Sequence, residues 1–182
     1  MTQTTETATT LREALNFVGG EWIAASDGAT FDVADPFTGE PVVRAAAGTR
    51  DDARRAVEAA AEAFPAWAAT PPAVRQGIFL RAADILESRR DEIVDLLARE
   101  TGSTFGFGMF QMMFTPGLLR QAAGSAYGPV GEVIPSDIPG AMAMGLRHPV
   151  GVVGAIAPWN AALILSLRSI TAPLVLGNTV VL

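Results

Sequence analysis

The sequence predicts an α/β fold with an incomplete parallel sheet, flanking helices and a separate antiparallel ribbon. Residues 150–157 (VGVVGAIA) form a short Val-rich apolar run, which is typical of a parallel strand buried on both faces. A helical stretch over 161–176 follows, and 179–182 (TVVL) start a second such strand. This segment has about the minimum length of a parallel crossover. Two further short strands, 132–135 and 141–148, predict the ribbon.

Composition limits the classes of function. The 182 residues are 49% hydrophobic, and the net charge of −6 comes without a basic run, which argues against nucleic acid as a ligand. No cysteine and a single histidine, His148, argue against a metal site, and we expect His148 to be a plain surface residue. Residues 1–10 lack the features of a signal peptide, and the apolar stretch 161–176 is too interrupted to span a bilayer. We therefore expect a cytoplasmic protein with no membrane partner.

The N-terminal part predicts a polar tail and a small β flap. We place a disordered tail over 1–15, because its first residues are polar and Thr-rich. Short strands are expected at 17–23, where Gly19-Gly20 makes a turn, at 31–34 and at 42–46.

Three helices are expected after the flap. Thr49 is a candidate N-cap of the first, and Pro65 should end or bend it. Pro72 opens the second helix, where its missing N–H does no harm. Residues 88–90 divide the second from the third, which should end at Gly102.

The segment 104–126 has two interpretations. It interleaves four phenylalanines with three methionines and contains early glycines and Pro116. One interpretation is a core helix, because Met and Phe mostly fill space. The other is the wall of an aromatic-lined pocket.

The loop between 150–157 and 161–176 is the place for a ligand, since open parallel sheets bind ligands at the carboxyl ends of their strands. Pro158 fixes the turn, Trp159 presents a flat face, and Asn160 offers an uncharged amide donor at a helix N-terminus. Such a donor suits a developing oxyanion. The simpler interpretation of Asn160 is the N-cap of that helix.

Motifs in a fixed order carry a resemblance. The stretch Ala157-Pro158-Trp159-Asn160 is followed, after a helix, by GNTVVL at 177–182. Upstream, in order, stand DPFTG at 35–39, FPAW at 64–67, ETG at 100–102 and YG at 127–128. Together they are similar to the aldehyde dehydrogenase superfamily, and the resemblance covers roughly residues 17–182.

The resemblance implies the N-terminal portion of the aldehyde dehydrogenase fold, with an incomplete Rossmann-like sheet and an oligomerisation ribbon. It also implies oxidation of an aldehyde to a carboxylic acid with NAD or NADP, through a Cys nucleophile and a Glu base. By carry-over, Asn160 is the side-chain donor of the oxyanion hole, and the cofactor cleft is lined by Ile156, Ala157, Pro158 and Trp159. No metal is implied, and the full-length enzyme would be a homodimer or homotetramer.

The resemblance further divides the chain. After the tail, 16–127 would belong to the cofactor-binding domain, 128–149 to the oligomerisation ribbon, and 150–182 to the first strand–helix–strand unit of the Rossmann-like domain. The family's Cys and Glu are absent, and the chain stops in an apolar strand, so we expect a fragment that is inactive on its own.

Arg168 departs from the family's pattern. The substrate tunnel would be lined by six side chains: Phe110, Phe114, Ala161, Ile164, Leu165 and Arg168. The last position is usually apolar or aromatic, whereas an arginine suits a phenolate, a hydroxyl or the product carboxylate. The combination resembles the salicylaldehyde, benzaldehyde and vanillin dehydrogenase branch and implies an aromatic aldehyde. The simpler interpretation is a surface arginine that reaches a carboxylate.

Two other functions stay open at this point. One is a short binding or assembly module without catalysis. The other is an aliphatic or semialdehyde dehydrogenase of the same family, against which Arg168 counts.

Overall fold

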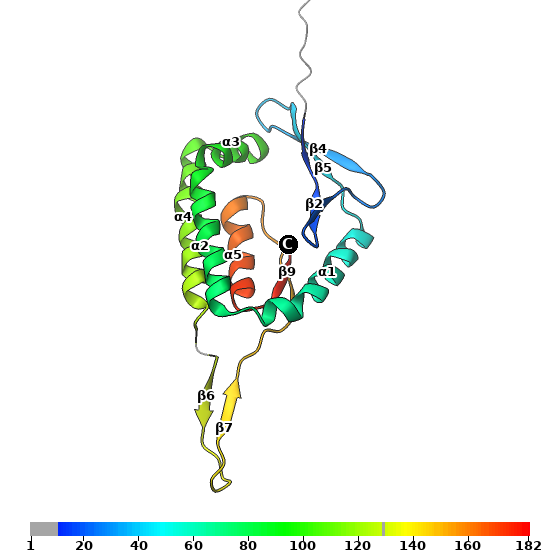
Figure 1. Cartoon of the computed structure of the whole chain (residues 1–182). Coiled ribbons are helices and arrows are strands. Elements are labelled where there is room, and N and C mark those ends of the chain that lie inside the picture. Colours follow the sequence, from blue (N-terminus) through cyan, green and yellow to red (C-terminus); the bar gives the residue numbers. More distant parts are fainter. Residues whose placement is uncertain (1–10, 129) are drawn as a thin grey trace, which may run out of the picture.

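Short strands form the flap at one end of the molecule (Figure 1). In this computed structural model, which describes residues 11–128 and 130–182, β1 (Arg12–Ala14) runs parallel to β5 (Pro41–Ala46). β5 also pairs antiparallel with β4 (Thr30–Ala34), while β2 (Asn16–Val18) and β3 (Glu21–Ile23) make a separate hairpin. The strands expected here are confirmed.

The disordered tail was expected to reach residue 15. Residues 1–10 of that tail lie outside the described residues. The expectation is wrong for Arg12–Ala14, because their backbone pairs with the edge of β5 and becomes a strand.

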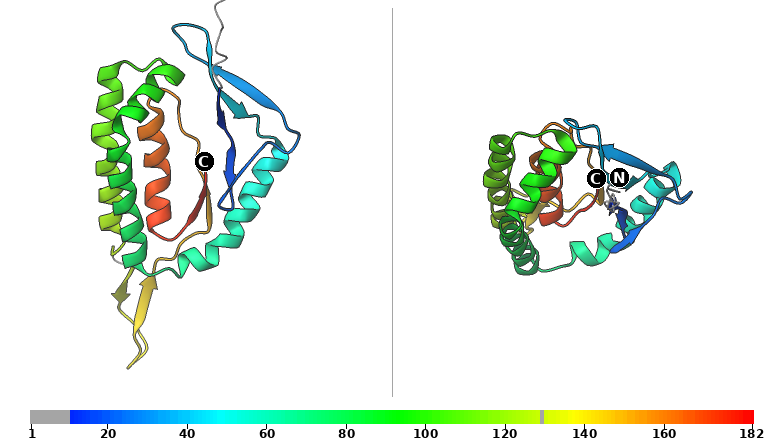
Figure 2. Two further views of the ribbon diagram at one scale, coloured as in Figure 1. Left: turned by 45° about the horizontal axis from the view of Figure 1, so that its top comes forward. Right: turned by 90° about the horizontal axis from the view of Figure 1, so that it is seen from above.

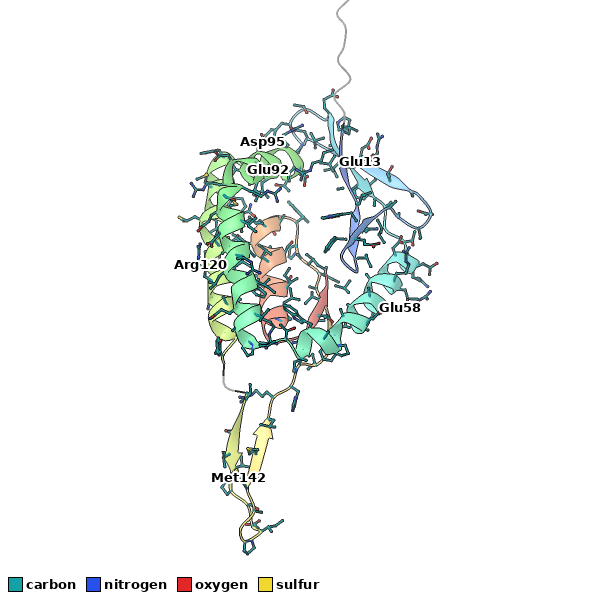
Figure 3. All side chains as sticks on the ribbon, viewed as in Figure 1. Glu13, Glu58, Glu92, Asp95, Arg120 and Met142 are labelled. Carbon is teal, nitrogen blue, oxygen red and sulfur yellow. The ribbon has the colours of Figure 1, made fainter. Side chains whose placement is uncertain are left out.

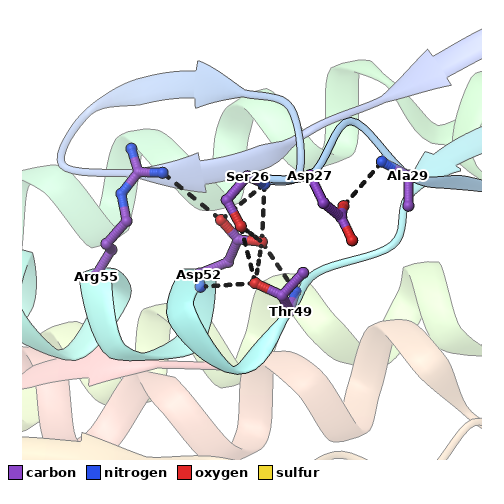
Figure 4. A network of polar contacts seen from close by, with 6 residues as sticks. All are labelled: Ser26, Asp27, Ala29, Thr49, Asp52 and Arg55. Atoms are coloured by element: carbon purple, nitrogen blue, oxygen red, sulfur yellow. Dashed lines mark hydrogen bonds and ion pairs between the residues drawn. The ribbon is translucent and has the colours of Figure 1, made fainter.

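Helix α1 (Arg50–Ala68) begins at the expected cap, which also binds the flap (Figure 4). The Asp52 N–H donates to Thr49 Oγ1 at 3.2 Å, and the Thr49 N–H donates to the Asp52 carboxylate at 2.9 Å, which is a capping box. The Ser26 N–H donates to the same carboxylate at 3.1 Å. These backbone donors, first that of Thr49 and then that of Ser26, lower the pKa of Asp52 from 3.8 to about 2.

Pro65 lies inside α1 and does not end it. The last turn is held from outside, since the Trp67 indole N–H donates to the Leu174 carbonyl oxygen at 2.9 Å. The two partners are 107 residues apart in sequence, so the local pattern could not show this contact.

Three more helices follow, of which the first two complete the expected set and the third covers the segment 104–126. α2 (Pro72–Ser88) and α3 (Arg90–Thr101) are separated at Arg89, and Gly102 ends α3 in the left-handed conformation with φ 67°. α4 (Phe105–Ser125) packs along α2 (Figure 1). Arg120, on the outer side of this pair, joins α4 to Asp84 and Glu87 of α2 (Figure 3).

The main core lies where α2, α4 and α5 (Ala162–Val175) meet. It is built from small and aliphatic side chains around one phenylalanine: Phe79, Ala83, Leu119, Ala122, Ala123, Ala126 and Val175. The alanines allow the helices to approach closely, which keeps α5 beside α4.

The ribbon and the parallel strand pair complete the structure. β6 (Gly131–Ile134) and β7 (Ala143–Leu146) form an antiparallel hairpin that projects from the body, with Met142 near its far end (Figure 3). β8 (Val152–Gly154) pairs parallel with β9 (Thr179–Val181), and this pair lies between α5 and α1 (Figure 2).

Strand β8 was expected to be buried on both faces, and this is wrong. Val152 and Val153 are half-buried, while the flanking Val150 and Ile156 are 86% and 98% exposed. Among the described residues, β9 is the only strand hydrogen-bonded to β8, so one edge of the strand lies open. Over the same residues, no helix combines the length and the apolar character needed to cross a membrane.

Candidate functional site

The loop at the carboxyl end of β8 is the expected ligand site, and it is open. Pro158 and Asn160 are exposed, Trp159 is 80% exposed, and Ala157 is half-buried. Gly154 ends β8, and an added Cβ there would meet no atom within 4 Å. The expected cofactor-cleft residues therefore form one exposed loop beside a parallel strand end, a suitable place for a nucleotide.

Asn160 is not the N-cap of α5, so the simpler interpretation of this residue is wrong. The cap position is Ala161, whose side chain has no acceptor, and α5 makes no side-chain cap of its own. Asn160 lies one residue earlier, in an exposed turn. The Asn160 side-chain amide therefore precedes the first turn of α5 and makes no capping hydrogen bond to it.

The first turn of α5 is capped by another helix. The Leu163 N–H donates to Oε1 of Gln111, which lies in α4, at 3.2 Å. Gln111 is 1% exposed and is among the largest fully buried side chains. Sequence reasoning missed this residue, and the one available signal was a polar amide inside the Met- and Phe-rich segment 104–126.

Helix α4 presents an aromatic face. The rings of Phe107, Phe110 and Phe114 follow one another with centroids 6.0 Å apart and interplanar angles of 12° and 21°. All three are at least 38% exposed, whereas α4 buries Gln111 and Thr115 together with the apolar Met112 and Leu119. The inner face of α4 is therefore part of the core, as one interpretation expected, and the exposed phenylalanines lie on its other side. Phe110 also borders an open cleft of about 530 Å³ that is lined by Glu87 and Arg90 as well and by no residue of α5.

The expected tunnel face of α5 is graded from buried to exposed. Ile164 is 7% exposed, Ala161 and Leu165 are half-buried, and Arg168 is exposed. Over residues 11–128 and 130–182, no carboxylate oxygen lies within 4.0 Å of the Arg168 guanidinium, so the surface ion pair considered for it has no partner there. His148 is exposed, as expected.

The far end of α5 is held by three polar side chains. Arg75 is 8% exposed, and its Nε donates to the Val175 carbonyl oxygen at 2.9 Å. Trp67 donates to Leu174, and Asn178 Nδ2 donates to Pro173 O at 3.1 Å. The carbonyls at a helix C-terminus lack partners within the helix, so these donors satisfy the end of α5.

Asn178 also ties the helix end to the strand that carries the site. Its Oδ1 accepts the N–H groups of Val150 and Gly151 at 2.7 and 3.2 Å. This side chain therefore fixes the entry to β8 while its amide nitrogen holds α5. In the same part of the chain that the structure describes, no cluster of three or more His, Cys, Asp or Glu side chains could hold a metal ion.

Comparison with known proteins places these features in a family context. The sequence pattern of the Aldehyde dehydrogenase family matches residues 22–182. A vanillin dehydrogenase of Pseudomonas fluorescens is 49% identical over 165 residues, which cover 91% of this chain and 34% of that protein. An NAD(+) benzaldehyde dehydrogenase of Pseudomonas putida is 39% identical over 161 residues, covering 88% and 33%.

A solved structure supports the same relationship. The salicylaldehyde dehydrogenase of Pseudomonas putida G7, crystallised with salicylaldehyde, superposes with a TM-score of 0.89 at 36% identity. The match covers 93% of this chain and 35% of that one. The chain thus spans about a third of the length of the relatives it matches.

Proposed function

Because the chain belongs to the aldehyde dehydrogenase family, we propose that it forms the substrate wall and the oxyanion donor of an NAD(P)-dependent aromatic aldehyde dehydrogenase. The observation that carries this proposal is the exposed Asn160 amide at the carboxyl end of β8, in a turn whose helix is capped by another residue. The products would be aromatic carboxylic acids.

Asn160 has a role set by chemistry. When a nucleophile adds to an aldehyde, the carbonyl oxygen gains negative charge, and a fixed N–H₂ group stabilises that charge more than it stabilises the substrate. The chain contains no cysteine, so the thiol nucleophile of the proposed reaction is not among these residues. The 182-residue chain alone is therefore expected to form no NADH or NADPH.

The loop residues fit a dinucleotide on steric grounds. Gly154 leaves the strand end open, and Ile156 and Trp159 offer apolar surface that a planar ring or ribose would cover. When bound, the nicotinamide of NAD or NADP accepts the hydride removed from the aldehyde carbon. We assign Ile156, Ala157, Pro158 and Trp159 to binding this cofactor.

An aromatic substrate is supported by two features of the proposed tunnel. The exposed rings of α4 can stack on a benzene ring, because offset aromatic pairs are favourable. The second feature is Arg168, a guanidinium with no carboxylate nearby among residues 11–128 and 130–182. It can meet a phenolate, a ring hydroxyl or the product carboxylate. We assign Phe110, Phe114, Ala161, Leu165 and Arg168 to this wall, with the buried Ile164 as its support.

The remaining segments receive structural roles in the proposal. Residues 16–127 and 150–182 contribute to the cofactor-binding domain, and the β6–β7 hairpin within 128–149 is the oligomerisation ribbon. The hairpin exposes several apolar side chains, including Val133, Met142 and Met144, which supports its assignment to a homodimer or homotetramer.

The test uses protein expressed from the whole reading frame that encodes this chain. We expect NADH or NADPH formation with vanillin, salicylaldehyde and benzaldehyde, and slower turnover of acetaldehyde. Asn160→Ala should lower kcat by roughly 100-fold, as loss of one oxyanion donor does elsewhere. Arg168→Leu should slow hydroxylated substrates more than benzaldehyde. Equal or faster turnover of acetaldehyde would instead favour an aliphatic enzyme.

A further inference from the structure

Helix α5 begins without a cap of its own, although a good cap residue is close by. The first N–H groups of a helix have no partner inside it and need acceptors from elsewhere. Ala161 occupies the cap position and offers no acceptor. Asparagine is among the best N-cap residues, yet Asn160 stands one position outside and takes no part in the cap.

Gln111 supplies the missing acceptor from α4. Its Oε1 accepts the Leu163 N–H at 3.2 Å, across 52 residues of sequence. The Leu165 N–H, two residues further on, is bonded to the Ala161 carbonyl oxygen at 2.9 Å. Gln111 thus accepts one of the N–H groups in the first turn of α5, and its side chain is itself buried to 1% exposure.

The position of Gln111 couples two parts of the proposed site. It follows Phe110 directly and precedes Phe114 by three residues in α4. A hydrogen bond from α5 to this residue therefore fixes the turn of Asn160 relative to the aromatic face. A shift of α5 by even a fraction of a helical turn would change the distance from the Asn160 amide to Phe110 and its distance to Phe114 together.

We propose that Gln111 is a positioning residue: by capping α5 from α4, it leaves the Asn160 amide free for the substrate oxygen and fixes that amide beside the aromatic wall. This inference rests on the proposed function. Without the Gln111 acceptor, the Leu163 N–H is left unpaired in a half-buried place, and Asn160, three residues earlier in the chain, carries an amide oxygen of the kind that caps helices. The amide would then be lost from the substrate oxygen.

The test compares two variants in the protein expressed from the whole reading frame. Gln111→Met keeps the length and removes the acceptor, whereas Gln111→Glu keeps an oxygen acceptor. Thr115→Val is the matched control, since the buried Thr115 hydroxyl donates to the Gln111 carbonyl oxygen at 2.7 Å and not to α5. The readouts are amide hydrogen exchange over residues 162–165 and the kinetics with benzaldehyde.

We expect Gln111→Met to speed exchange over 162–165 by about ten-fold, as expected for a lost buried hydrogen bond. It should also lower kcat by at least about ten-fold with little change in KM, because the lost contact acts only on the transition state. Gln111→Glu should retain most of both properties, and Thr115→Val should leave both unchanged.

Two results would overturn the inference and leave the proposed function intact. Unchanged amide exchange in Gln111→Met would show that Gln111 does not cap α5. Faster exchange with an unchanged kcat would show that the cap does not position Asn160. An unmodified protein that oxidises no aldehyde would overturn the proposed function and the positioning role with it. Hydrogen exchange would then still test whether Gln111 caps α5.

Discussion

Arg75 is expected to be the most important single polar side chain for the stability of this chain. It is buried to 8% exposure and joins two helix C-termini. Its Nε donates to the Val175 carbonyl oxygen at the end of α5, and its Nη1 donates to Thr70 O just after α1, with Trp67 O and Ala68 O at 3.4 and 3.5 Å. The negative ends of two helix dipoles thus share one cation.

Replacing Arg75 with Met removes two good charged hydrogen bonds and leaves buried carbonyl groups unpaired. Each such bond is worth about 1.5–3 kcal/mol, so we expect a loss of about 3 kcal/mol in the free energy of unfolding. With a urea m-value of about 2 kcal/mol per M, the unfolding midpoint should fall by roughly 1.5 M. Arg75→Lys keeps the positive charge but not the planar set of guanidinium N–H donors, so it should lose about half as much free energy of unfolding.

The control is Arg81→Met on the same helix, at an exposed position. Urea unfolding followed by circular dichroism measures all three variants at one pH. A midpoint shift in Arg75→Met no larger than that of Arg81→Met would refute the reasoning, because it would mean that water or relaxed backbone replaces the guanidinium without cost.

Three shorter predictions follow from local geometry. The folded-state pKa of Asp52, about 2, lies below the ordinary 3.8, so its stabilising effect is complete above pH 4 and is lost as the pH falls from 3.8 to 2. Asp52→Asn should flatten the pH dependence of unfolding in that window. Thr49→Ala should cost about 1 kcal/mol through loss of the N-cap, measured by urea unfolding. Gly131→Ala would drive a Cβ into the Gly145 carbonyl oxygen and should open the β6–β7 pair, whereas Gly145→Ala meets no atom within 4 Å; amide exchange distinguishes them.

Features set by neighbouring residues could be predicted from the sequence. The Thr49 cap and the Gly102 stop need only residues within one helical turn, and both are confirmed. The parallel orientation of β8 and β9 follows from the length of the crossover between them. Burial of β8 could not be predicted, because it depends on which elements cover the strand and not on its own Val-rich sequence.

The polar contacts that set the site were beyond sequence reasoning for a different reason. Gln111 meets Leu163 across 52 residues, and Arg75 meets Val175 across 100. Their segments gave only helical signals, and a buried Gln or Arg looks like any other polar residue until its partner is known. The local sequence predicts Asn160 as a cap because the acceptor that takes this role, Gln111, lies on a different helix.

Both ends of α5 are therefore held by residues that do not belong to it. Gln111 caps the start, while Trp67, Arg75 and Asn178 satisfy the end. The helix itself contributes mainly apolar packing and the proposed tunnel face. Exchanging the tunnel residues of α5 for those of a relative should then change substrate preference without moving the helix. An exchange that alters Gln111 or Arg75 should displace Asn160 whatever the tunnel residues are.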